Sequence, residues 1–128
     1  MNEDLLKNGA FGWFELMTTD VDTAKGYYGE LFGWEYETVP MPGSDYTVIK
    51  VDGKAVAGIM DMPAECKGME PGWDIYITVN DVDTVAKGVV DLGGRILKPL
   101  FDIPVNSSIV ETLDTQGAVL CAMTSTNK

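Results

Sequence analysis

The chain has 128 residues, a length that suits one compact domain with a hydrophobic core of its own. Its net charge of -11 makes nucleic acid and anionic membranes poor partners for its surface. It has no histidine, no apolar run long enough to cross a bilayer, and two cysteines, Cys66 and Cys121, that form no CxxC motif. We therefore expect a cytoplasmic protein without a signal peptide that binds neither nucleic acid nor membrane.

The first half of the chain predicts the element order βαβββ. A strand over residues 10–17 precedes a helix that is capped by Thr19 or Asp20 and ends at Gly33. Apolar residues in this helix recur at the i, i+3, i+4, i+7 spacing of a buried stripe. Asp52-Gly53 predicts a tight hairpin turn between the last two of the three strands that follow. These strands are expected over residues 34–39, 46–51 and 54–60.

The second half of the chain predicts the same order after a linker. Residues 62–72 contain prolines and glycines without a hydrophobic period, which is typical of a linker. A strand over residues 73–79 and a helix from about Asp81 to Leu92, closed by Gly93-Gly94, come next. The last three strands are expected over residues 95–98, 107–113 and 118–124.

A repeated sequence links the two halves. Asp-Val-Asp-Thr occurs at residues 20–23 and again at 81–84, and a gap-free alignment places Gly33 on Gly94. We interpret the chain as a duplicated unit, with residues 1–61 as the first module and residues 73–128 as the second, packed together as one compact domain. The alternative is that two unrelated helices share one start signal.

Alternation along the first strand of each module predicts which side chains face the helix. Leu16 and Ile77 belong to the apolar sides, which must meet the helices of their modules. The opposite faces mix large aromatic residues with carboxylates and a hydroxyl, a composition typical of a ligand cavity. The alternative is a plain interface or a solvated sheet face. These opposite faces carry Trp13, Glu15, Met17, Asp74, Tyr76 and Thr78, and the last strand adds Cys121 and Met123 or their neighbours.

Residues 12–20, Gly-Trp-Phe-Glu-Leu-Met-Thr-Thr-Asp, and residues 31–34, Leu-Phe-Gly-Trp, resemble a known family. They are similar to the vicinal oxygen chelate superfamily of glyoxalases, bleomycin-resistance proteins and extradiol dioxygenases, and most of all to its glyoxalase-like branch. The second half, with Asp81-Val82-Asp83 and Leu92-Gly93-Gly94, is similar to the family's second module. The resemblance implies an α+β fold in which two tandem βαβββ modules form a curved mixed sheet around a central cavity, with the helices outside.

The resemblance also implies where a metal would bind. Metal-using members take ligands from the first and last strand of each module. The first-strand positions match Trp13 and Asp74, and the last-strand positions, counted from the turn glycines, match Ala57 and Cys121. Tryptophan and alanine cannot ligate, and the remaining pair falls short of the three protein ligands of a usual catalytic site. We therefore expect no metal and no other cofactor.

Without a metal, proton transfer must fall to carboxylates, tyrosine, cysteine or lysine. Glu15 is the candidate general base, because burial beside Trp13 and Met17 should raise its pKa. Tyr76 is placed to donate a hydrogen bond to a developing oxyanion. The alternative is that Glu15 is a structural carboxylate bonded to a neighbouring strand. The expected substrate-binding residues are Trp13, Met17, Asp74, Thr78, Cys121 and Met123, with Cys121 as a packed, inert thiol.

Two functions remain open at this point. The first is a metal-independent, glyoxalase-like enzyme of the lyase or isomerase type that acts on a small organic molecule. The alternative is a resistance-type protein that sequesters a small aromatic or cationic compound without turnover, through charge pairing and ring contacts. In both cases we expect a small-molecule ligand and a homodimer. A subunit that uses this face for homodimerisation alone is a third possibility.

Overall fold

The computed structural model describes residues 7–40, 45–62, 70–103 and 107–125. In these residues it has the predicted α+β fold, with two βαβββ modules in tandem. Residues 63–69, most of the expected linker including Cys66, lie outside the described residues. The first module contains β1 (Phe11–Thr18), α1 (Val21–Phe32), β2 (Glu35–Val39), β3 (Tyr46–Val51) and β4 (Lys54–Asp61). The second contains β5 (Gly72–Thr78), α2 (Val82–Asp91), β6 (Arg95–Ile103), β7 (Ser107–Leu113) and β8 (Val119–Ser125).

The chain forms two compact units whose boundaries fall inside strands. One unit runs from Phe14 to Asp74, and the other combines the preceding residues, up to Trp13, with those from Ile75 onward. The N-terminal stretch joins the second unit through backbone hydrogen bonds of 2.8 Å, from Gly9 N to Thr78 O and from Thr78 N to Ala10 O. Trp13 on β1 therefore belongs to a different unit from Glu15, two residues further along the same strand.

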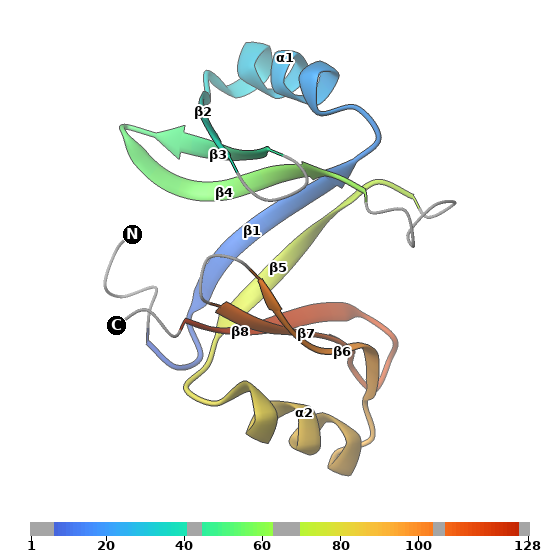
Figure 1. Ribbon diagram of the computed structural model, residues 1–128. Helices are drawn as coiled ribbons and strands as arrows, with labels where there is room; N and C mark the ends of the chain where they lie inside the picture. The colour runs from blue at the N-terminus through green and yellow to red at the C-terminus, as the bar shows by residue number, and fades with distance from the viewer. Residues whose placement is uncertain (1–6, 41–44, 63–69, 104–106, 126–128) are drawn as a thin grey trace. The chain divides into compact units, whose positions relative to one another are not determined.

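In the first unit, α1 covers one face of a sheet with the strand order β2-β3-β4-β1 (Figure 1). β1 and β4 are parallel, while β2, β3 and β4 pair antiparallel. The core on the helix side comprises Leu16, Ile49, Ala57 and Ile59, and side chains of α1 pack against it. The prediction that Leu16 faces the helix is confirmed.

The second unit repeats this arrangement with the order β5-β8-β7-β6 and α2 over one face (Figure 1). The core on the helix side contains Val82, Val110 and Ala122. Because side chains alternate along a strand, the neighbours of these residues in β7 and β8 point to the other face. There a second cluster forms from Tyr76, Ile109 and Cys121.

The repeated Asp-Val-Asp-Thr segments start both helices. The Asp20 carboxylate accepts hydrogen bonds from Thr23 N at 3.1 Å and Thr23 Oγ1 at 2.7 Å, and Asp81 does the same with Thr84 at 3.3 and 2.9 Å. These bonds satisfy N–H groups that the first helical turn leaves unpaired. They also stabilise the charged carboxylate, so the pKa values of Asp20 and Asp81 are lowered, chiefly by the threonine hydroxyls.

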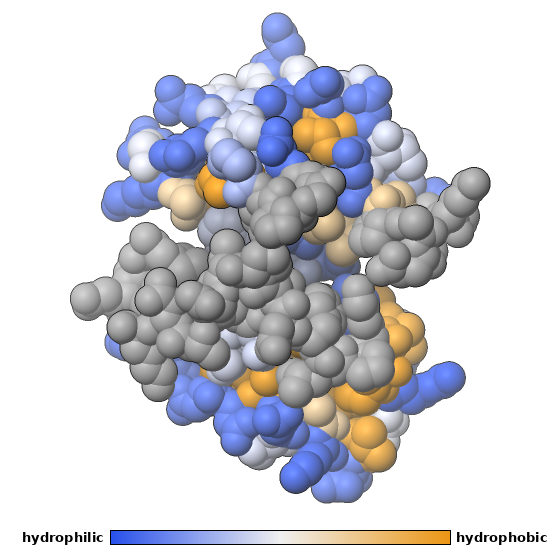
Figure 2. Space-filling model, in the orientation of Figure 1, coloured by the Kyte–Doolittle hydropathy of each residue, from blue (hydrophilic) through white to orange (hydrophobic). Residues whose placement is uncertain are grey.

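Hydrophobic residues gather on the surface of the second unit, near α2 and the turn between β7 and β8 (Figure 2). Exposed ones include Val90, Leu92 and Val119. Among the described residues, no helix is long and apolar enough to span a membrane.

Candidate functional site

Glu15 lies on the face of the first unit's sheet opposite to α1. Its side chain is partly buried, and its Oε2 accepts a hydrogen bond of 2.7 Å from the hydroxyl of Tyr46. Tyr46 begins β3, which is separated from β1 by β4, so the phenol ring has to cross β4 to reach this carboxylate. The short hydrogen bond to a carboxylate oxygen holds the Glu15 side chain in one orientation.

Gly58 is the residue of β4 over which the ring of Tyr46 passes. In the strand pairing, Gly58 lies beside Glu15 on one side and Val48 on the other. A Cβ atom at residue 58 would lie 1.7 Å from Tyr46 Oη and 2.2 Å from its Cζ. Since non-bonded heavy atoms pack at about 3.5–4.0 Å, any side chain there would displace the phenol. The contact between Tyr46 and Glu15 therefore depends on this glycine.

Counting from the turn glycine assigned the last-strand ligand position of the first module to Ala57, and the structure corrects this assignment. Ala57 is buried on the helix side, in the core with Leu16. A β-bulge causes the shift, because Ile49 pairs with Ala57 whereas Lys50 pairs with Ala55, leaving Val56 as an extra residue in β4. The equivalent of Cys121 is therefore Gly58, which offers no ligand atom either.

In the second unit, the predicted catalytic residue Tyr76 and three of the predicted binding residues lie together on the face opposite α2. Tyr76 and Cys121 are 3% and 1% exposed, and the partly buried Trp13 and Met123 pack against them. Thr78, also buried, lies beside Met123 in the pairing of β5 with β8. This half of the predicted set is thus a tightly packed cluster of rings and sulfur atoms.

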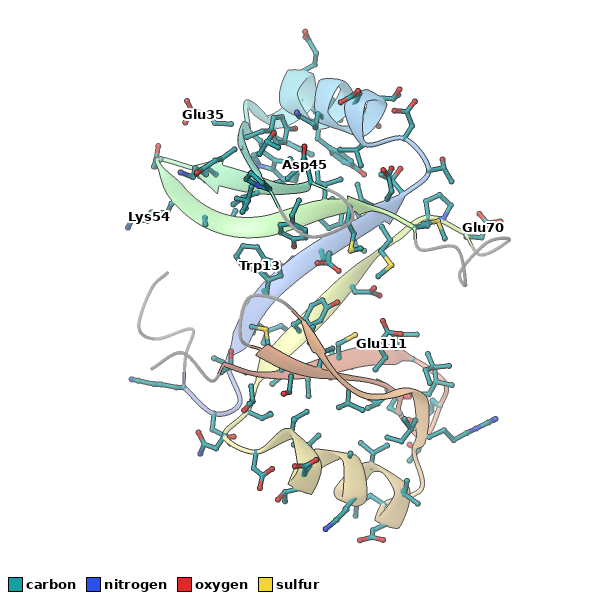
Figure 3. All side chains as sticks on the ribbon, viewed as in Figure 1. Trp13, Glu35, Asp45, Lys54, Glu70 and Glu111 are labelled. Atoms are coloured by element: carbon teal, nitrogen blue, oxygen red, sulfur yellow. The ribbon has the colours of Figure 1, made fainter. Side chains whose placement is uncertain are left out.

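Asp74, Glu111 and Cys121 form a polar group on β5, β7 and β8. Each offers a ligand atom, and these atoms all lie within 4.8 Å of one another. Burial raises the pKa of Asp74. Glu111 projects from β7 on the side away from α2 (Figure 3). The sequence analysis missed Glu111, although alternation along β7 and its pairing with Cys121 across the hairpin give a signal that places it on this face.

The donor set does not match the family's metal site, which draws on both modules. Trp13 and Gly58 stand at the first module's two positions and offer no metal ligand. Asp74 and Cys121 stand at the second module's positions, and Glu111 joins them from a strand that the family pattern does not use. Two carboxylates and one thiol thus form a partial set, confined to the strands β5, β7 and β8.

Met17 and Met60 are paired on β1 and β4, and both are partly buried. Met17 follows Glu15 on the same face of its strand, because side chains two residues apart in a strand point the same way. The predicted cooperation of Glu15 with Tyr76 remains a prediction.

A separate hollow of about 370 Å³ lies on the helix side of the first unit. Tyr27, Tyr28 and Trp73 line it together with Asp20 at the start of α1. Tyr28 and Trp73 touch edge to face with ring centroids 5.5 Å apart, and Trp73 Nε1 donates a 3.3 Å hydrogen bond to Tyr28 Oη. Leu16, which faces α1, also lines this hollow, so it opens on the opposite side of the sheet from Glu15.

Residues 10–121 match the sequence-family model of the Glyoxalase/Bleomycin resistance protein/Dioxygenase superfamily. The chain belongs to this superfamily. It is 40% identical over 117 residues to "Putative glyoxylase CFP32" of Mycobacterium bovis and 32% identical over 123 residues to anthracycline biosynthesis protein DauV of a Streptomyces species. These matches cover 89% and 86% of the chain but 45% of each relative. This superfamily member thus spans less than half the length of these relatives.

Solved structures support the same fold. A protein from Bacillus halodurans superposes with a TM-score of 0.72 at 10% identity, covering 95% of this chain and 98% of the other. Methylmalonyl-CoA epimerase of Mycobacterium tuberculosis gives 0.63 at 18% identity, with coverages of 88% and 85%. At such low identity these likenesses establish the fold alone.

Proposed function

We propose that this superfamily member is a glyoxalase-like enzyme that moves a proton at a carbon next to a carbonyl group of a small organic molecule. The observation that carries the proposal is the Glu15 carboxylate, partly buried on the helix-free face and held at 2.7 Å by Tyr46. A fixed and partly desolvated carboxylate has the properties of a general base. The relative named as a glyoxylase supports an enzyme of this class.

In the proposed step, Glu15 removes the proton from the substrate carbon. The C–H bond breaks, the proton binds a carboxylate oxygen, and the electron pair moves to the carbonyl oxygen as an enolate. A hydrogen-bond donor at that oxygen, whose negative charge grows as the proton leaves, stabilises the enolate. Return of the proton to a neighbouring atom completes an isomerisation, whereas its return to the same carbon gives only exchange with solvent; neither outcome needs an oxidant or a second substrate.

We propose that this step proceeds without the family's metal. Trp13 and Gly58 at the first module's ligand positions support this view, because neither can bind a metal ion. Hydrogen bonds then stabilise the negative charge on the enolate, so a general base and a hydrogen-bond donor suffice for the step.

The experiment is proton exchange in D₂O, followed by ¹H NMR. The panel contains thioesters, 2-oxo acids and 2-hydroxy ketones, and includes methylmalonyl-CoA, the substrate named in a structural neighbour. We expect loss of the α-proton signal of at least one compound in the presence of the protein and no loss with Glu15→Gln. Exchange that survives in Glu15→Gln would contradict the assignment of the base.

A second candidate function, binding without turnover, is favoured by the hollow beside α1. Three aromatic rings and the Asp20 carboxylate suit an organic cation, which is attracted by ring faces and by negative charge. Isothermal titration with tetramethylammonium and with a cationic dye tests this function. Binding that is lost in Tyr27→Ala and Trp73→Ala but kept in Glu15→Gln would place the ligand in this hollow, and unchanged binding in both would exclude it.

A further inference from the structure

The contact between Tyr46 and Glu15 requires an unusual path for a side chain. Tyr46 on β3 and Glu15 on β1 are not paired, because β4 lies between them. A tyrosine that begins β3 would ordinarily stand upright from the sheet. Here its ring lies across β4 instead, above the backbone of Gly58, so that its hydroxyl ends 2.7 Å from the Glu15 carboxylate.

Gly58 serves this contact through its missing side chain and not through its backbone. It is absent from the glycines with a positive φ in the described residues, so its conformation is one that other residues also adopt. A glycine inside a strand weakens the strand and often marks a close approach of another group. At Gly58 the approaching group is the phenol of Tyr46.

We propose that Tyr46 is a positioning residue for Glu15, and that Gly58, which has no side chain, leaves the space through which the Tyr46 ring reaches the carboxylate. A carboxylate on a flexible stem of two methylene groups has several rotamers, and the phenol selects one by donating a hydrogen bond to one of its oxygens. The carboxylate then meets a substrate in one fixed orientation. The catalytic consequence rests on the proposed role of Glu15 as the base, whereas the contact itself does not.

The first test measures the contact without any substrate. The ¹³C resonance of the Glu15 carboxyl, assigned through its disappearance in Glu15→Gln, is compared in wild type, Tyr46→Phe and Gly58→Ala. We expect Tyr46→Phe and Gly58→Ala each to shift this resonance. Gly72→Ala is the matched control, because Gly72 is also a strand glycine and its added Cβ would meet nothing within 4 Å. A resonance that stays in place in both variants would overturn the proposal.

The second test uses the steric conflict itself. Gly58→Ala should lower the midpoint of chemical denaturation in the wild-type background but leave it nearly unchanged in Tyr46→Ala, where the ring is gone. Tyr46→Phe does not give this relief, since its Cζ would still lie 2.2 Å from the new methyl group. An equal loss in both backgrounds would show that the glycine is needed for another reason.

The third test separates positioning from mere stability. On any compound that shows proton exchange, Tyr46→Phe should reduce kcat about tenfold, the loss of one hydrogen bond to a charged group, with KM nearly unchanged. An unchanged kcat would overturn the positioning role even where Glu15→Gln abolishes exchange. If no compound exchanges, the proposed function fails, while the carboxyl resonance and the denaturation series still decide the contact.

Discussion

The first and second modules can be compared at three positions that their strand pairing makes equivalent. In each module one position lies on the first strand, one on the third and one on the fourth, all on the face opposite to the helix. They hold Glu15, Tyr46 and Gly58 in the first module, and Tyr76, Ile109 and Cys121 in the second.

The difference shows how one backbone supports two kinds of site. In the second module an isoleucine takes the position of Tyr46 and a thiol fills the space that Gly58 leaves open, so the three side chains pack as a cluster. In the first module the missing side chain opens a path for a phenol to reach a carboxylate. At these three positions the second module therefore has a packed cluster, whereas the first module has a hydrogen-bonded pair of polar side chains.

The largest expected effect contrasts the two first-strand positions. Glu15→Gln should reduce proton exchange by about 100-fold or more, because a positioned general base contributes about 10²–10⁴ to the rate. Tyr76→Phe, at the equivalent position of the second module, should reduce it less. Glu35→Gln, on the exposed edge strand, is the control and should leave the rate unchanged. A larger loss in Tyr76→Phe than in Glu15→Gln would reverse the assignment.

Core truncations compare the stability of the two units. Ile59→Ala in the first and Ile109→Ala in the second should each lower the free energy of unfolding by about 2–5 kcal/mol, because both side chains are buried and leave a cavity. Chemical denaturation followed by tryptophan fluorescence and by circular dichroism measures the loss. If the units unfold separately, each variant should move one of two transitions. A single transition that both variants move equally would show that the units unfold together.

A smaller, pH-dependent effect is expected at Asp74. Burial raises its pKa in the folded protein, so the unfolded chain releases this proton at lower pH than the folded one. Ionised Asp74 therefore destabilises the fold above the unfolded-state pKa, and the full cost is reached above the raised folded-state pKa. Asp74→Asn should raise Tm at pH 7 and change it little at pH 3. A lower Tm at pH 7 would mean that a partner stabilises the ionised carboxylate.

The smallest expected effect is that of added metal. Zinc, nickel, manganese or iron(II) should not raise Tm appreciably, because the first module supplies no ligand at the family's positions. Thermal unfolding with each ion, against a chelator control, measures this. A rise that disappears in both Asp74→Ala and Glu111→Ala would contradict the expectation and show that the partial donor set of the second module binds the ion.

Most of the fold could be predicted because its signals are local. The Asp-Val-Asp-Thr repeat marks both helix starts, and the structure confirms Asp20 and Asp81 as the caps. Gly33 has a φ of 69°, as a left-handed cap residue requires. The strand from residue 95 runs further than predicted, to Ile103, because its pairing with β7 extends past Pro99 with changes of register that no local pattern reveals.

The candidate site was harder to predict because it depends on pairing between distant strands. Alternation identified Glu15 as lying on the helix-free face, but not that Tyr46, 31 residues away, would reach it across a strand. Counting from a turn glycine failed at Ala57, since one bulged residue moves every residue beyond it to the opposite face of the strand from the one that counting predicts. Glu111 was missed because only the register of β7 with β8 brings it beside Cys121.

The extra residue at Val56 limits how this module can be redesigned. A histidine introduced at residue 57, where counting from the hairpin suggests a ligand, would be buried under α1 in apolar surroundings. The same histidine at residue 58 would face the intended side but push the Tyr46 ring away from Glu15. Introducing a metal ligand of the family's type at this strand would therefore require removing the bulge or the tyrosine as well, and not a single exchange of side chains.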